Sequence, residues 1–166
     1  MKNPVSTKLG EDSAHEAARP STRTLDFTMT IRNPEVFDLC AGLVLAELYE
    51  SFPLPTEVRY LAVYENLAKK FPDQDVAEYV NLISIIRNTV LWLGKTGHLW
   101  YASTNGDHAT GVQLSEKGLR ALREIPKSID AERKTVGDYL VAAAKEGAKE
   151  ALKKGIAILF GAVVVQ

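Results

Sequence analysis

Hydrophobic and polar residues follow regular periods along much of this chain, and these periods predict an order of elements. Residues 24–31, TLDFTMTI, alternate strictly between apolar and polar, which predicts a half-buried strand. Asn33-Pro34-Glu35 then supplies the cap, the proline and the acidic residue that are typical of a helix start. An apolar stripe continues to about Ser51, and the prolines of SFPLPT end this helix.

Two further helices are predicted after these prolines. Thr56 can cap a helix over about 57–71, and Asp73 can cap another over about 74–93. Gly94 suits the carboxyl-terminal cap of the last of these helices. That helix is apolar over most of its circumference and keeps only a narrow polar strip.

A β-hairpin is predicted next. HLWYAS is rich in aromatic residues and is bounded by glycines, which is typical of a strand, and TGVQL is its expected return strand. Asn105-Gly106 lies between the two and is a strong signal for a tight turn.

The stretch 111–126, GVQLSEKGLRALREIP, joins the return strand to a helix without a loop. Ser115 caps this helix, which runs from Glu116 to about Glu124. The stretch resembles the second wing strand and following helix of MarR-like and PadR-like winged-helix proteins. There, an apolar residue precedes a Ser or Thr cap, an acidic residue, a basic residue and Gly.

A second stretch, IIRNTVLWLGKTGHLWYAS, resembles the end of the third helix of these proteins and its turn into the wing. The resemblance covers roughly residues 35–126. It implies a winged helix-turn-helix, a mainly α fold with a small antiparallel β wing. The residue pattern beyond this stretch predicts that a long C-terminal amphipathic helix follows the wing. Such folds serve DNA binding and protein docking alike.

In the DNA-binding use of this fold, the third helix enters the major groove and the hairpin reaches the backbone or the minor groove. Asn and Arg side chains can hydrogen-bond to base edges, and Lys can bind phosphate. The contact residues that the resemblance implies are Asn81, Ser84, Arg87 and Asn88 on the helix, and Lys95, Asn105 and His108 around the wing.

Charge keeps a second function open. The whole chain has a net charge of −1, but residues 35–126 hold eight basic and twelve acidic residues. Because phosphate contacts dominate DNA affinity, a DNA-binding protein usually shows a basic footprint. We therefore weigh a DNA-binding regulatory protein against a winged-helix protein–protein interaction module that does not bind DNA.

The C-terminal segment is predicted to form one long amphipathic helix. The residues from Thr135 to Asp138 fit a capping box at its start. Small residues recur along one side and let helices approach closely, which favours self-association as a homodimer; packing within the chain and contact with a membrane surface are the alternatives. The residues predicted to carry self-association are Ala144, Ala148, Ala151, Leu152, Gly155, Ile156 and Leu159.

No catalytic or metal-binding pattern stands out, so we predict a protein that is not an enzyme and needs no cofactor. Cys40 is the single cysteine, which suits a reducing, cytoplasmic setting. His98 and His108 are expected as surface polar residues at the base and tip of the hairpin. The predicted organisation is a flexible tail over 1–23, a winged-helix domain with its N-terminal strand over 24–126, and a helical segment over 127–166.

Overall fold

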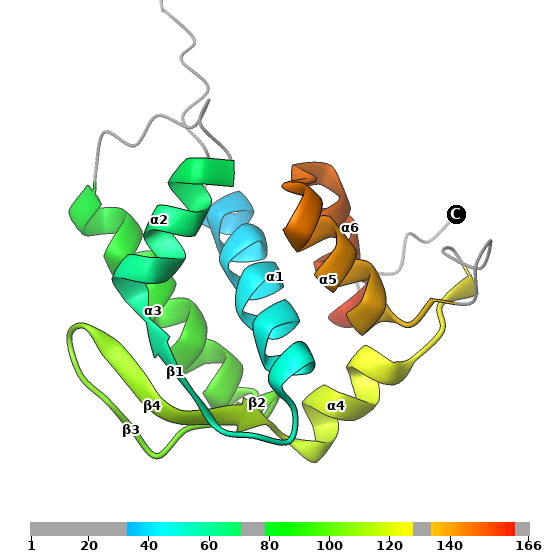
Figure 1. Cartoon of the computed structure of the whole chain (residues 1–166), viewed down its shortest axis with the longest axis horizontal. Coiled ribbons are helices and arrows are strands. Elements are labelled where there is room, and N and C mark those ends of the chain that lie inside the picture. Colours follow the sequence, from blue (N-terminus) through cyan, green and yellow to red (C-terminus); the bar gives the residue numbers. More distant parts are fainter. Residues whose placement is uncertain (1–32, 71–78, 128–133, 162–166) are drawn as a thin grey trace, which may run out of the picture.

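A computed structural model describes residues 33–70, 79–127 and 134–161 of the chain. In this part the protein is mainly α-helical with a small antiparallel sheet (Figure 1). The elements in chain order are α1 (Asn33–Ser51), β1 (Thr56–Arg59), α2 (Tyr60–Lys70), α3 (Tyr79–Lys95), β2 (Leu99–Trp100), β3 (Ser103–Thr104), β4 (His108–Leu114), α4 (Glu116–Arg123), α5 (Val136–Glu146) and α6 (Lys149–Leu159).

Helix α1 is the centre of the fold. It is buried over much of its circumference, because α3, α5 and α6 all pack against it. Figure 1 shows α2, α3 and the sheet on one side of α1, with α5 on the other. The sequence predicted an apolar stripe for α1 and a narrow polar strip on the third helix. The structure keeps that polar strip of α3 exposed and encloses α1 on more sides than a single stripe requires.

The sheet is built around β4, with the order β1-β4-β2, and β3 also pairs with β4. All pairs are antiparallel. The predicted hairpin is confirmed, since Trp100 pairs with Gln113 and Thr104 with Ala109. Leu99, Val112 and Leu114 are buried on the side that faces the helices, so the sheet closes one end of the core.

The prediction of a helix over 57–71 is wrong at its start. Thr56–Arg59 forms β1, and Val58 pairs with Ala109 of β4 before α2 begins at Tyr60. In this short stretch Val58 is buried between exposed Glu57 and Arg59, which is the alternation of a strand. Pairing with a strand that lies about fifty residues further along the chain decides the local structure, and local sequence cannot show this.

Helix α3 ends differently from the prediction. It continues through Gly94 to Lys95, and Gly97 is the residue with a positive φ of 75° in the turn that follows. Gly94 has another role, because the ring of Tyr101 packs against it so closely that a Cβ would lie 2.5 Å from a ring carbon. The predicted start of this helix and the predicted strand over 24–31 lie outside the described residues.

The prediction of a single long C-terminal helix is wrong. The segment forms two helices, because Gly147 adopts a left-handed conformation (φ 66°) that ends α5 before α6 begins at Lys149. The capping box at the start of α5 is confirmed, with Thr135 and Asp138 bonded reciprocally. Both helices pack against α1 and contribute Leu140, Leu152 and other side chains to the same core as the rest of the chain.

Candidate nucleic-acid interface

The exposed face of α3 carries all the helix residues that the sequence assigned to DNA contact. These residues recur three or four positions apart, so they share one side of the helix, while Ile86, Val90 and Leu93 on the opposite side are fully buried. The exposed residues of α3 whose side chains are described are Asn81, Ser84, Arg87, Asn88, Trp92 and Lys95.

This face is positively charged and rich in hydrogen-bonding groups. Helix α3 contains Arg87 and Lys95 and no carboxylate between Tyr79 and its end, so its side chains carry a net charge of +2. The amide of Asn88 donates to the carbonyl oxygen of Ser84 at 2.8 Å, a bond within the exposed helix surface. The arrangement can donate hydrogen bonds and offers positive charge to an anionic partner.

A lysine side chain from α4 contacts and stabilises the carboxyl-terminal end of α3. The Nζ atom of Lys117 donates to the carbonyl oxygen of Thr96 at 2.7 Å, just beyond the last residue of the helix. A positive charge there is favourable, because the end of a helix carries partial negative charge. Lys95 and Lys117 thus extend the positive charge of α3 toward α4.

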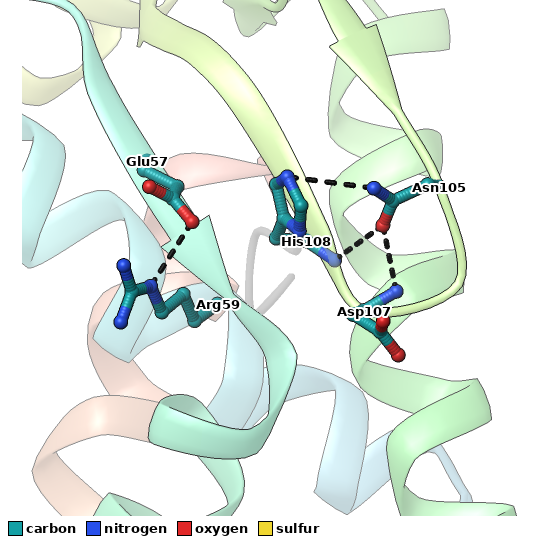
Figure 2. A network of polar contacts seen from close by, with 5 residues as sticks. All are labelled: Glu57, Arg59, Asn105, Asp107 and His108. Carbon is teal, nitrogen blue, oxygen red and sulfur yellow. Dashed lines mark hydrogen bonds and ion pairs between the residues drawn. The ribbon is translucent and has the colours of Figure 1, made fainter.

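Asn105 shapes the tip of the hairpin. Its Oδ1 atom accepts hydrogen bonds from the backbone N–H groups of Asp107 and His108, at 2.8 and 2.9 Å (Figure 2). Its Nδ2 atom lies 3.4 Å from Nε2 of His108. The side-chain oxygen of Asn105 is therefore committed to the turn, as is typical of an Asx turn, and this residue positions the tip.

A pair of charged residues on β1 lies beside this tip and was missed by sequence reasoning. Nε of Arg59 donates to Oε1 of Glu57 at 3.0 Å, and Arg59 pairs with His108 across the two strands (Figure 2). The hydrogen bond from Arg59 lowers the pKa of the Glu57 carboxyl below its ordinary value, with a smaller contribution from the charge of His108. The predicted helix over 57–71 hid this pair, because only β1 brings it to the hairpin.

His98 lies in a different environment from the one expected. It is buried rather than exposed, and its Nδ1 atom lies 2.8 Å from the hydroxyl of Thr96. Its ring stacks on Trp92 and meets Phe160 edge-on. Burial, and after it the charge of Lys117, lowers the pKa of His98. This aromatic cluster ties the end of α3 to the end of α6.

The residues assigned to self-association lie against the chain's own core. Leu152, Gly155 and Ile156 are buried, and a Cβ on Gly155 would lie 2.5 Å from a methyl carbon of Leu140. The small residue thus allows close packing of α5 and α6 within one chain. Half-buried members of the set, which also pack on this core, are Ala144, Ala148, Ala151 and Leu159.

The described residues also bear on metal binding and on the single cysteine. They contain no group of three or more His, Cys, Asp and Glu side chains placed to hold a metal ion. Burial raises the pKa of the Cys40 thiol to about 12, so the reactive thiolate is disfavoured. Cys40 is a fully buried residue of α1.

None of the helices in the described part of the chain is both long enough and apolar enough to cross a membrane. Comparisons of this chain with known protein families, with curated proteins and with solved structures found no match.

Proposed function

We propose that this protein is a winged-helix DNA-binding regulatory protein in which α3 enters the major groove. The order of three helices, α1 to α3, followed by an antiparallel hairpin supports this assignment of the fold. The strand β1 adds a third strand to that hairpin by pairing with β4. The short helix α4, which starts directly after β4, matches the stretch that resembles winged-helix proteins.

The exposed face of α3 is the observation that carries this proposal. Its side chains include Asn81, Asn88 and Arg87, which can hydrogen-bond to base edges, and Lys95, which can bind a phosphate. An α-helix fits the major groove of B-DNA.

The acidic balance of residues 35–126 is compatible with this use of α3. Exposed charges separated by more than about 10 Å are largely screened at 0.1 M salt, so the charge close to the contact surface counts most. Helix α3 has a side-chain charge of +2 over its described length. Carboxylates such as Glu47 and Glu50 belong to α1, which packs directly against α3.

Binding of the full chain to a random-sequence duplex tests the proposal. Fluorescence anisotropy at about 50 and about 200 mM salt should show binding that weakens as salt rises, since phosphate contacts release counterions. A protein with no measurable affinity at the lower salt concentration would not be a DNA-binding protein of this kind, because non-specific binding depends on these contacts alone.

A protein-docking module is the second candidate. Its support is two large exposed apolar side chains, Leu54 with 68% and Trp100 with 57% of its surface accessible. Exposed aromatic residues are enriched in protein interfaces. An absence of DNA binding at low salt would favour this candidate. The first variant to test would then be Trp100→Ala, measured for loss of affinity toward a protein that binds the wild type.

Self-association as a homodimer stays a prediction. The buried positions of the C-terminal set are occupied within one chain, so a dimer would use the outward edges of Ala144, Ala148, Ala151 and Leu159, or another surface. Sedimentation equilibrium of the full chain measures the oligomeric state directly. A monomer at all concentrations would remove this part of the proposal.

A further inference from the structure

We propose that Arg59 on β1 is the residue through which the sheet contacts a DNA phosphate, and that Glu57 weakens this contact by holding the guanidinium. This inference rests on the proposed function and adds a contact residue that lies outside both α3 and the hairpin. It also assigns a role to the ion pair between these two side chains.

The distribution of charge along the sheet leads to Arg59. The chain from His98 to Glu116, which holds the whole hairpin, contains no Lys and no Arg. Among the strands of the described part of the chain, Arg59 therefore supplies the one fixed positive charge. A hairpin that reaches the DNA backbone needs such a charge, because phosphate contacts provide most of the affinity of this kind of protein.

The position of Arg59 matches that need. It is the last residue of β1 and pairs with His108, the first residue of β4, at the tip of the hairpin. The next residue holds this junction in place, since the N–H of Tyr60 donates to the carbonyl oxygen of Asp107 at 3.0 Å and its hydroxyl lies 2.6 Å from that of Thr104. A β1 residue thus provides the charge that the hairpin lacks.

The side chain of Arg59 is accessible to a ligand. It is exposed over 70% of its surface, and its contact with Glu57 uses the Nε atom. A guanidinium also carries two terminal NH2 groups, which can bind two phosphate oxygens at once. An exposed ion pair of this kind is weak, so a phosphate can replace the carboxylate.

Glu57 opposes binding for two reasons. Its carboxylate competes with a phosphate for the same guanidinium, and its negative charge repels a phosphate that approaches Arg59. Since Val58 is buried between them, Glu57 and Arg59 lie on the same outer side of β1 and any ligand of one meets the other. Removal of the charge at Glu57 should therefore strengthen binding.

The test compares the full-length wild type with three variants on a random-sequence duplex, across a range of salt concentrations. We expect Arg59→Gln to weaken binding about tenfold at 0.1 M salt and to reduce the magnitude of the salt slope by about 0.9, the values for one lost phosphate contact. Glu57→Gln should bind about two- to fivefold more tightly than the wild type, as expected for release from an exposed ion pair.

The matched control is Arg120→Gln. Arg120 is also an exposed arginine paired with a glutamate, Glu116, at 2.6 Å, but it lies on α4. Its loss changes the net charge by the same amount and should leave affinity within about twofold of the wild type, as for a rim charge outside the contact. Circular dichroism confirms that each variant folds like the wild type.

Three outcomes would overturn the inference, and they are distinguishable. If the wild type does not bind the duplex at low salt, the proposed function is wrong, and so is the assignment of Arg59 as a phosphate contact. If the wild type binds and Arg59→Gln binds equally well, the assignment of Arg59 alone is wrong. If Arg59→Gln and Arg120→Gln weaken binding equally, net charge accounts for the effect and the site on β1 is rejected.

Discussion

Gly118 of α4 lies directly against the carbonyl oxygen of His98: a Cβ on this glycine would be 1.9 Å from that oxygen. The same carbonyl accepts a hydrogen bond from the N–H of Ser115 at 3.2 Å. Helix α4 can begin immediately after β4 because its first turn packs on the turn that precedes β2. The glycine in GVQLSEKGLRALREIP is therefore a packing requirement.

The variant Gly118→Ala should be destabilised by about 1–3 kcal/mol, because backbone atoms on both sides must move apart to admit the methyl group. This loss outweighs the higher helix propensity of alanine, which is worth up to about 1 kcal/mol. Gly106→Ala is the control, since nothing lies within 4 Å of a Cβ there. Urea unfolding measures both, and equal stability of the two variants would contradict the close approach.

Ser115 supplies a second prediction for the same junction. Its hydroxyl accepts from the N–H of Gly118 at 3.0 Å and donates to the carbonyl oxygen of Gly97 at 2.6 Å, and the residue is 3% exposed. Ser115→Ala should cost about 1–3 kcal/mol, because it removes a helix cap and leaves a buried partner without its hydrogen bond. Retention of wild-type stability in a urea titration would show that the cap is dispensable.

The two C-terminal helices should unfold together with the rest of the chain. Leu152 is fully buried and packs over Gly42 of α1, where an added Cβ would lie 2.9 Å from it. Leu152→Ala should therefore lower the free energy of unfolding by about 2–5 kcal/mol. Lys154→Ala, at an exposed position on the same helix, is the control. A separate early transition for α5 and α6 would show that they form an independent unit.

His98 should make stability depend on pH. Its pKa is lowered below the ordinary 6.5, chiefly by burial, so the unfolded chain binds this proton more tightly than the folded protein. The stabilisation is fully present above about pH 6.5 and is lost as pH falls from there toward the folded-state pKa. We expect the free energy of unfolding to be lower at pH 5.5 than at pH 7.5 on this account.

The variant His98→Phe separates the pH dependence due to His98 from that due to Asp38 and Glu47, which change the free energy of unfolding in the opposite direction. Burial raises the pKa of both carboxyls, so their protonation favours the folded state as pH falls. The variant keeps an aromatic ring against Trp92 and should lose less stability than the wild type between pH 7.5 and 5.5. If NMR shows His98 titrating at or above pH 6.5, the explanation is wrong.

Much of the helical part of the fold could be predicted because its signals are local. The caps at Ser115 and Thr135 and the prolines after Ser51 each depend on residues within one turn, and the structure places elements there accordingly. β1 could not be predicted in this way, since its partner is β4. The break at Gly147 was also missed, because a regular pattern of small residues continues through it.

The candidate site likewise contains residues that could be placed from the sequence and residues that could not. The exposed face of α3 follows from helical periodicity, so Asn81, Arg87 and Asn88 could be placed from sequence. The role of Asn105 within the turn and the burial of His98 depend on three-dimensional contacts. Arg59 could not be found, because its nearness to the hairpin comes from pairing between distant strands.

NMR chemical-shift mapping of the full chain with a short DNA duplex at low salt locates the surface that binds DNA. If α3 and the sheet form this surface, the shifted amides fall in Asn81–Lys95, at Arg59 and around Asn105, with α5 and α6 little affected. Spectra that do not change, or changes confined to α4, α5 and α6, would rule out DNA binding by α3 and the sheet.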